Sequence, residues 1–130
     1  HPDLEVELLL TDRVVRVVEE GVDVAVRIAE LPDSGLTAVR VRDVRRVLVA
    51  SPDYLARRGS PESVADLHDH AIIAVDAFAP NNEWRFAGDR PQTVRLQPRL
   101  RVNDMAAAIA AAAAGVGISR VFCYQVVDEV

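Results

Sequence analysis

The first part of the chain combines two hydrophobic patterns. Residues 4–10 change from alternation to a fully apolar run, which predicts a strand buried on most of both faces. Residues 14–18 place valines at helical spacing before Gly21, a helix stop, and residues 23–28 predict a second strand. This order predicts a β-α-β unit with parallel strands over residues 4–28.

The middle of the chain predicts two strands and then two short helices, over residues 36–42, 45–50, 52–58 and 60–67. Ser51 and Pro52 supply the start signal for the first helix, because a serine hydroxyl caps orphan amides and proline suits the first helical position. Gly59 then stops that helix, and the pair Ser60-Pro61 repeats the start signal.

The last part predicts three strands, a helix and a final strand, over residues 71–75, 84–87, 93–102, 105–114 and from 118 onward. Residues 76–83 form a polar loop, Asn103-Asp104 caps the helix, and residues 123–130 open a further amphipathic helix. The whole order predicts an α/β protein in two lobes.

Composition narrows the function classes. The 130 residues carry 15 basic and 20 acidic side chains, which gives a net charge of −5. We therefore expect that this chain itself does not bind duplex DNA specifically. The apolar runs are too short for a membrane-spanning helix, which needs about 20 residues. A single cysteine, Cys123, excludes an internal disulfide and fits a reducing compartment. The first residue is His1, which is typical of a piece of a longer protein.

Thr11 and Asn103 stand where predicted strands lead into predicted helices. Helix N-termini attract anions, and open α/β sheets bind ligands at the carboxyl ends of their strands. Both residues are therefore candidate ligand contacts that we expect to face each other across a cleft. The alternative is that each only caps its helix.

Arg27 interrupts an apolar run at the end of a predicted strand. A guanidinium there can form a bidentate contact with a carboxylate ligand, or it can form a structural ion pair with Glu30 or Asp33. Other candidates are weaker, because His68 and His70 at spacing i, i+2 are poorly placed to share a metal. We find no convincing catalytic constellation, so no enzyme activity is expected.

Seven short segments follow one another across essentially the whole chain, at residues 1–8, 11–28, 50–59, 66–70, 84–86, 102–105 and 114–118. In their order and spacing they resemble the effector-binding domain of LysR-type transcriptional regulators. This resemblance implies a two-lobed fold like that of type 2 periplasmic binding proteins. Residues 1–45 would then be part of the first lobe, residues 46–118 the second lobe with crossover strands, and residues 119–130 a return towards the first lobe or the start of a following helix.

The same resemblance implies a ligand site between the lobes. The family's effector contacts fall on Thr11, Arg27, Asp76, Ala77, Phe78, Asn103 and Asp104. The implied partner is a small-molecule effector, often a carboxylate, and no cofactor or metal is expected.

In this family a separate N-terminal winged helix-turn-helix domain, outside this chain, binds the DNA. The full-length protein is then expected to be a cytoplasmic homodimer or homotetramer without membrane contact. Two alternatives share the fold: an extracytoplasmic solute-binding protein and, less in keeping with the sequence, an enzyme.

Overall fold

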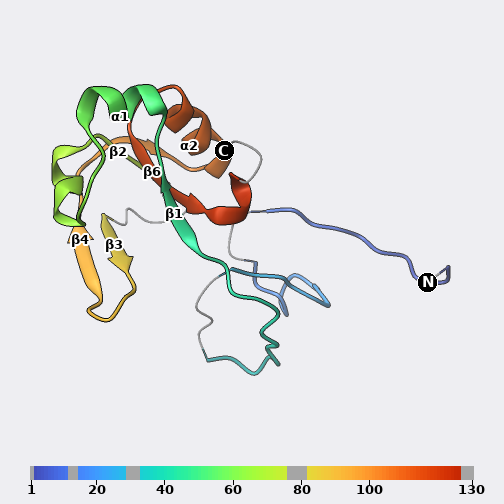
Figure 1. The fold of residues 1–130 in the computed structure, drawn as a ribbon. Coiled ribbons are helices and arrows are strands. Elements are labelled where there is room, and N and C mark those ends of the chain that lie inside the picture. Colours follow the sequence, from blue (N-terminus) through green and yellow to red (C-terminus); the bar gives the residue numbers. More distant parts are fainter. Residues whose placement is uncertain (1, 12–14, 29–32, 76–81, 127–130) are drawn as a thin grey trace.

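The computed structural model of the chain describes residues 2–11, 15–28, 33–75 and 82–126 (Figure 1). Within them, every helix and strand lies after Arg45. In chain order the elements are β1 Arg46–Val49, α1 Pro52–Arg58, the 3-10 helix η1 Ala65–Asp69, β2 Ile72–Val75, β3 Glu83–Phe86, β4 Gln92–Arg95, β5 Pro98–Val102, α2 Met105–Ala113, β6 Ile118–Phe122 and the 3-10 helix η2 Cys123–Gln125.

A four-stranded sheet with the order β1-β6-β2-β5 forms the centre of this region. Strand β2 runs parallel to both β5 and β6, and β1 runs antiparallel to β6 with Arg46 opposite Phe122. Strands β3 and β4 form a separate antiparallel pair. The region is therefore mixed α/β, as the sequence predicts.

Two neighbouring isoleucines of β2 belong to different cores, because successive strand residues point to opposite faces. Ile72 packs in a cluster that includes Tyr54 of α1, Leu67 of η1 and Trp84 of β3. Ile73 packs against alanines of α2, whose small side chains let the helix approach the sheet closely. The central sheet thus has packed partners on both faces.

Capping residues fix both α-helices where the sequence predicts them. The Ser51 hydroxyl accepts a hydrogen bond from the Tyr54 amide at 3.2 Å, Pro52 occupies the first turn, and Gly59 follows with a positive φ of 80°. The Asp104 carboxylate accepts from the Ala107 amide at 2.8 Å. The predicted helices at 52–58 and 105–114 are confirmed, and so are strands at 71–75, 84–87 and from 118.

Two predictions in this region need correction. The helix expected at 60–67 is replaced by η1, because the Asp66 carboxylate accepts from the amides of Glu62 at 2.9 Å and Ser63 at 2.8 Å and holds those residues in a turn. The single strand expected at 93–102 is split into β4 and β5. Its two halves pair with different strands, β3 and β2, so the chain passes from one sheet to the other between them.

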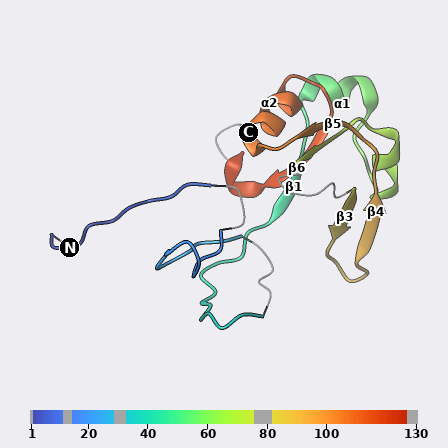
Figure 2. The ribbon, with the colours of Figure 1, turned by 180° about the vertical axis from the view of Figure 1, so that it is seen from behind.

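The β-α-β unit predicted over residues 4–28 and the strand predicted over 36–42 are wrong. None of the described residues there is helical or in a strand, and Leu10 is 82% and Val26 92% exposed. A strand needs a neighbour for its backbone groups and a layer over its apolar face, and no described strand lies beside these residues. Figures 1 and 2 show the first residues running away from the labelled elements.

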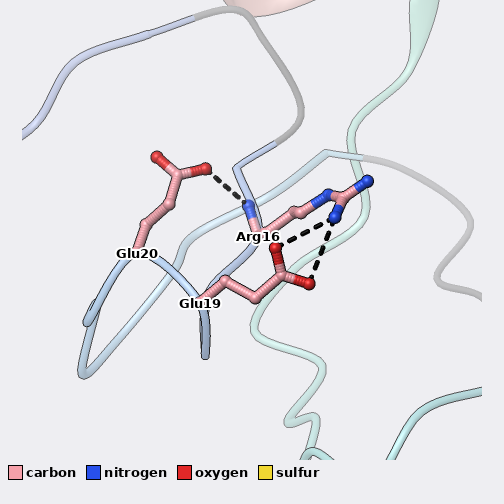
Figure 3. Close-up of polar contacts among 3 residues, drawn as sticks. All are labelled: Arg16, Glu19 and Glu20. Carbon is pink, nitrogen blue, oxygen red and sulfur yellow. Dashed lines mark hydrogen bonds and ion pairs between the residues drawn. The ribbon is translucent and has the colours of Figure 1, made fainter.

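Local polar contacts shape the one turn described in the segment expected to be helical. The Arg16 amide donates to the Glu20 carboxylate at 2.9 Å, and the Arg16 guanidinium pairs with Glu19 at 2.9 Å (Figure 3). Both partners of the ion pair are exposed, so it contributes little to stability. Without a packed face, these contacts produce a turn and not a helix.

Candidate functional site

A cavity of about 100 Å³ opens where β2 ends and α2 begins. Ile73, Ala74 and Val75 of β2 line it together with Met105, the first residue of α2. Because β6 runs parallel to β2, the second half of β6 reaches the same edge of the sheet, where open α/β folds bind ligands. The remaining walls are Arg46, Glu83, Trp84, Arg120, Val121 and Phe122.

Arg120 is a half-buried cation held against aromatic rings in this cavity. Its guanidinium carbon lies 5.3 Å from the ring centre of Trp84 and 5.8 Å from that of Phe86. One of its amino groups donates to the backbone carbonyl of Arg85 at 3.0 Å. Cation–π contacts and this hydrogen bond fix the guanidinium while leaving other N–H donors for a ligand.

The charge of Arg120 is not balanced within the described residues. Burial and, to a smaller degree, repulsion from Arg46 lower the pKa of Arg120 to about 10. The guanidinium carbon of Arg46 itself lies 5.0 Å from the ring centre of Phe122. Glu83 also lines the cavity, but no carboxylate among the described residues contributes to the pKa of Arg120 or forms an ion pair with it. A half-buried guanidinium that has a second cation beside it and no carboxylate partner among the described residues favours an anionic ligand.

Arg120 was missed by the sequence analysis, although a usable signal was present. It interrupts the apolar run of β6, Ile-Ser-Arg-Val-Phe, in the same way that Arg27 interrupts its own apolar run. The criterion applied to Arg27 would have selected Arg120 as well. The order of the strands, which places β6 beside β2, was needed to locate it at a ligand-binding edge.

The ligand contacts predicted at this edge of the sheet are sequence neighbours of residues that line the cavity. Val75 and Met105 line it, and they are the immediate neighbours of Asp76 and Asp104. The Asp104 side chain caps α2, which leaves Asn103 as an exposed residue and not the helix cap. The other three predicted contacts, Asp76, Ala77 and Phe78, lie outside the described residues.

Thr11 and Arg27 do not line this cavity. Both are exposed, and no helix follows Thr11 in residues 15–28. The Arg27 guanidinium donates to the backbone carbonyl of Val15, so the expectation that Arg27 ends a buried strand is wrong. Of the ion-pair partners considered, Glu30 lies outside the described residues, and Asp33 forms no ion pair with Arg27.

Two further features, a metal site and a membrane-spanning helix, were looked for in the described part of the chain. It contains no group of three or more His, Cys, Asp or Glu side chains that could hold a metal ion. None of its helices is long and apolar enough to cross a membrane.

Comparison with solved structures shows to which class of domain the chain belongs. The chain superposes on CrgA, a LysR-type transcriptional regulator from Neisseria meningitidis, with a TM-score of 0.79 and 26% identity, covering 98% of this chain and 44% of that one. The CrgA regulatory domain alone matches with a TM-score of 0.71 and 28% identity, covering 86% of this chain and 55% of that one. The chain therefore has the mixed α/β architecture of these regulatory domains, which is periplasmic-binding-protein-like.

The particular family follows from the sequence. Residues 1–130 match the LysR substrate binding domain, and the chain belongs to this family. Relatives include the HTH-type transcriptional regulator PgrR of Escherichia coli K12, 34% identical over 92% of this chain and 41% of that protein. The HTH-type transcriptional activator AaeR of the same organism is 30% identical over 100% of this chain and 42% of that protein. The chain thus spans about two fifths of the length of these relatives, and the predicted family and fold are confirmed.

Proposed function

We propose that this chain is the ligand-sensing part of a DNA-binding transcriptional regulator and that its effector is a small organic anion. The single observation that supports an anionic effector is Arg120, a half-buried guanidinium without a carboxylate partner among the described residues. Trp84 and Phe86 hold this guanidinium in place through their rings, so that its remaining N–H groups can pair with a small carboxylate.

The effector would bind between two lobes, with the Arg120 cavity contributing the second-lobe side. Asn103, Asp104 and the segment Asp76–Phe78 adjoin the cavity in sequence, and Thr11 and Arg27 would approach from the first lobe. Binding would change the closure of the lobes and thereby the spacing of attached DNA-binding domains. The names of the relatives, which are transcriptional regulators, favour this role over a solute-binding protein of the same fold.

This proposal places a winged helix-turn-helix elsewhere in the full-length protein. That protein would be a cytoplasmic homodimer or homotetramer. The net charge of −5 on the present chain supports leaving DNA recognition to another domain.

The test uses Trp84, the protein's single tryptophan, as a reporter inside the cavity. Fluorescence titration of the chain with a panel of small carboxylates, and with the matching neutral amides, should find acids that bind while their amides do not. Replacing Arg120 by Met keeps an apolar stem and removes the charge. It should weaken binding by about ten- to a hundredfold, the usual effect of losing a charge-assisted hydrogen bond.

Arg99→Met is the matched control, because Arg99 is an exposed residue of β5 that does not line the cavity. It removes the same charge and should leave the affinity unchanged. Equal affinities in Arg120→Met and the unaltered chain would contradict the proposal, as would a panel in which amides bind as well as acids.

A further inference from the structure

Arg120 has a second arginine beside it, on the neighbouring strand of the central sheet. Strands β1 and β6 lie side by side (Figure 1), with Arg46 directly opposite Phe122 and Leu48 directly opposite Arg120. Because residues two apart on a strand point to the same face, these four side chains share one face of the sheet. The two arginines occupy one diagonal of this group, and Leu48 and Phe122 occupy the other.

The diagonal brings the two guanidiniums within reach of one ligand. Diagonal neighbours across an antiparallel pair lie about 7–8 Å apart, a separation that long side chains can bridge. Arg46 and Arg120 both line the cavity at the end of β2. After burial, repulsion from Arg46 is the cause that lowers the pKa of Arg120, so the two charges act on one another.

Aromatic rings hold both guanidiniums in place. The guanidinium carbon of Arg46 lies 5.0 Å from the ring centre of Phe122, and that of Arg120 lies 5.3 Å from the ring centre of Trp84. Contact with a ring uses the flat side of a guanidinium and leaves N–H groups at its edge, which is the side that pairs with carboxylates. The cavity therefore presents two positioned anion-binding groups.

Acidic side chains do not neutralise this pair. Neither guanidinium forms an ion pair with a carboxylate among the described residues. Glu83 is the one described carboxylate in the lining, and in the hairpin it stands directly opposite Arg95, a cation that does not line the cavity. Like charges on neighbouring strands repel, and a ligand with two negative charges would replace that repulsion by two attractions.

We propose that Arg46 and Arg120 together bind a dianion, and that the effector is a short dicarboxylate whose two carboxylates each pair with one arginine. Phe122, which lines the cavity beside both arginines, would contact the hydrocarbon spacer. The cavity of about 100 Å³ restricts that spacer to a few carbon atoms. This inference rests on the proposed function, because it describes the same site more closely: Arg120 selects an acid, and Arg46 selects its second acidic group.

The experiment compares each dicarboxylate with its own monoamide, which has nearly the same size and one negative charge less. Malonate, succinate and glutarate, and their monoamides, are titrated into the 130-residue chain at low salt, with the fluorescence of Trp84 as the readout. At least one dicarboxylate should bind about fivefold more tightly than its monoamide, the upper range for an ion pair at an exposed arginine.

Variants assign that preference to Arg46. Arg46→Met should lower the affinity for the dicarboxylate to that of the monoamide and should leave the affinity for the monoamide unchanged. Arg45→Met is the matched control, because Arg45 is exposed and does not line the cavity. It removes the same charge from the adjacent position and should leave the preference for the dicarboxylate intact.

The outcomes separate this inference from the proposed function. If dicarboxylates and their monoamides bind equally well, or if Arg46→Met and Arg45→Met behave alike, the role of Arg46 is overturned. Weaker binding of those same acids to Arg120→Met would in that case still support an anionic effector. If none of the acids binds, both proposals are overturned.

Discussion

The described residues before Arg46 and those from Arg46 to Val126 have similar apolar patterns but adopt different structures. Ile73 in β2 is 1% exposed, whereas Ile28, which ends a comparable run of apolar residues, is 45% exposed. Ile73 has strands on both sides and α2 against it, and Ile28 has no described strand as a neighbour. An apolar run thus specifies a strand only where backbone partners and a covering layer are supplied as well.

Hydrogen exchange should reveal the largest difference between the two regions. Amides of β2 and β6, which pair within the central sheet, should exchange on the order of a thousandfold or more slowly than amides of residues 4–10. The measurement is residue-resolved exchange by NMR. Similar protection in both regions would mean that residues 4–10 pair with a strand in solution.

One substitution made in both regions sharpens the comparison. Ile73→Ala empties a packed position and should lower the free energy of unfolding by about 2–5 kcal/mol. Ile28→Ala, the matched control, should change it by less than about 1 kcal/mol. Urea unfolding followed by the fluorescence of Trp84, itself 7% exposed, measures both. A comparable loss in the two variants would show that Ile28 is packed in solution.

A pair of glycines tests close packing in the same way. A Cβ at Gly117 would lie 2.2 Å from the carbonyl oxygen of Ala71, and that oxygen already accepts from the Ile118 amide at 2.8 Å. Because the obstacle is backbone, Gly117→Ala should cost about 1–3 kcal/mol. Gly35→Ala meets no atom within 4 Å and should stay within about 0.5 kcal/mol. Thermal unfolding of both variants checks this, and a neutral Gly117→Ala would contradict it.

The smallest expected effect depends on pH. Hydrogen bonds from Ser63, through its side chain and its amide, and from the Glu62 amide lower the pKa of Asp66. A lowered pKa means that the carboxylate stabilises the fold above the ordinary pKa of about 3.9, and that this contribution is lost as the pH falls through the lower folded value. Asp66→Asn should therefore reduce stability slightly near pH 7 and not at very low pH.

Asp89→Asn is the control for that measurement. Asp89 is exposed in the hairpin turn and makes no hydrogen bond in the described part of the chain, so the substitution removes the same charge without removing a cap. Unfolding curves recorded at several pH values compare the two. Identical pH dependence in both variants would exclude a capping role for Asp66.

The fold could be predicted from the sequence where signals are local. Ser51, Gly59 and Asp104 fix helix ends through contacts within a few residues, and those helices are confirmed. The division of residues 93–102 between two sheets depends on partners far away in the chain, so periodicity alone could not reveal it. The failure over residues 4–28 has the same physical origin, because strand pairing is not a local property.

The candidate site could be predicted only to the nearest element. The start of α2 was predicted from the α/β order and the loop after β2 from the family resemblance, and their sequence neighbours Met105 and Val75 line a cavity. Arg120 was not predicted because its position in the cavity depends on β6 lying beside β2 and on the hairpin that places Trp84 against it. The proposed roles of Thr11 and Arg27 remain predictions.

The pairing of β1 with β6 gives this domain an engineering property. The chain enters the central sheet at Arg46 and leaves it at Phe122, and these residues are opposite one another, at the roughly 5 Å separation of antiparallel partners. A segment whose two ends meet can be inserted into a surface loop of a host protein without separating the flanks of that loop. Residues 45–123 therefore have ends suited to insertion into a host protein, and a ligand at the proposed Arg120 site would act on the host through a single two-stranded ribbon.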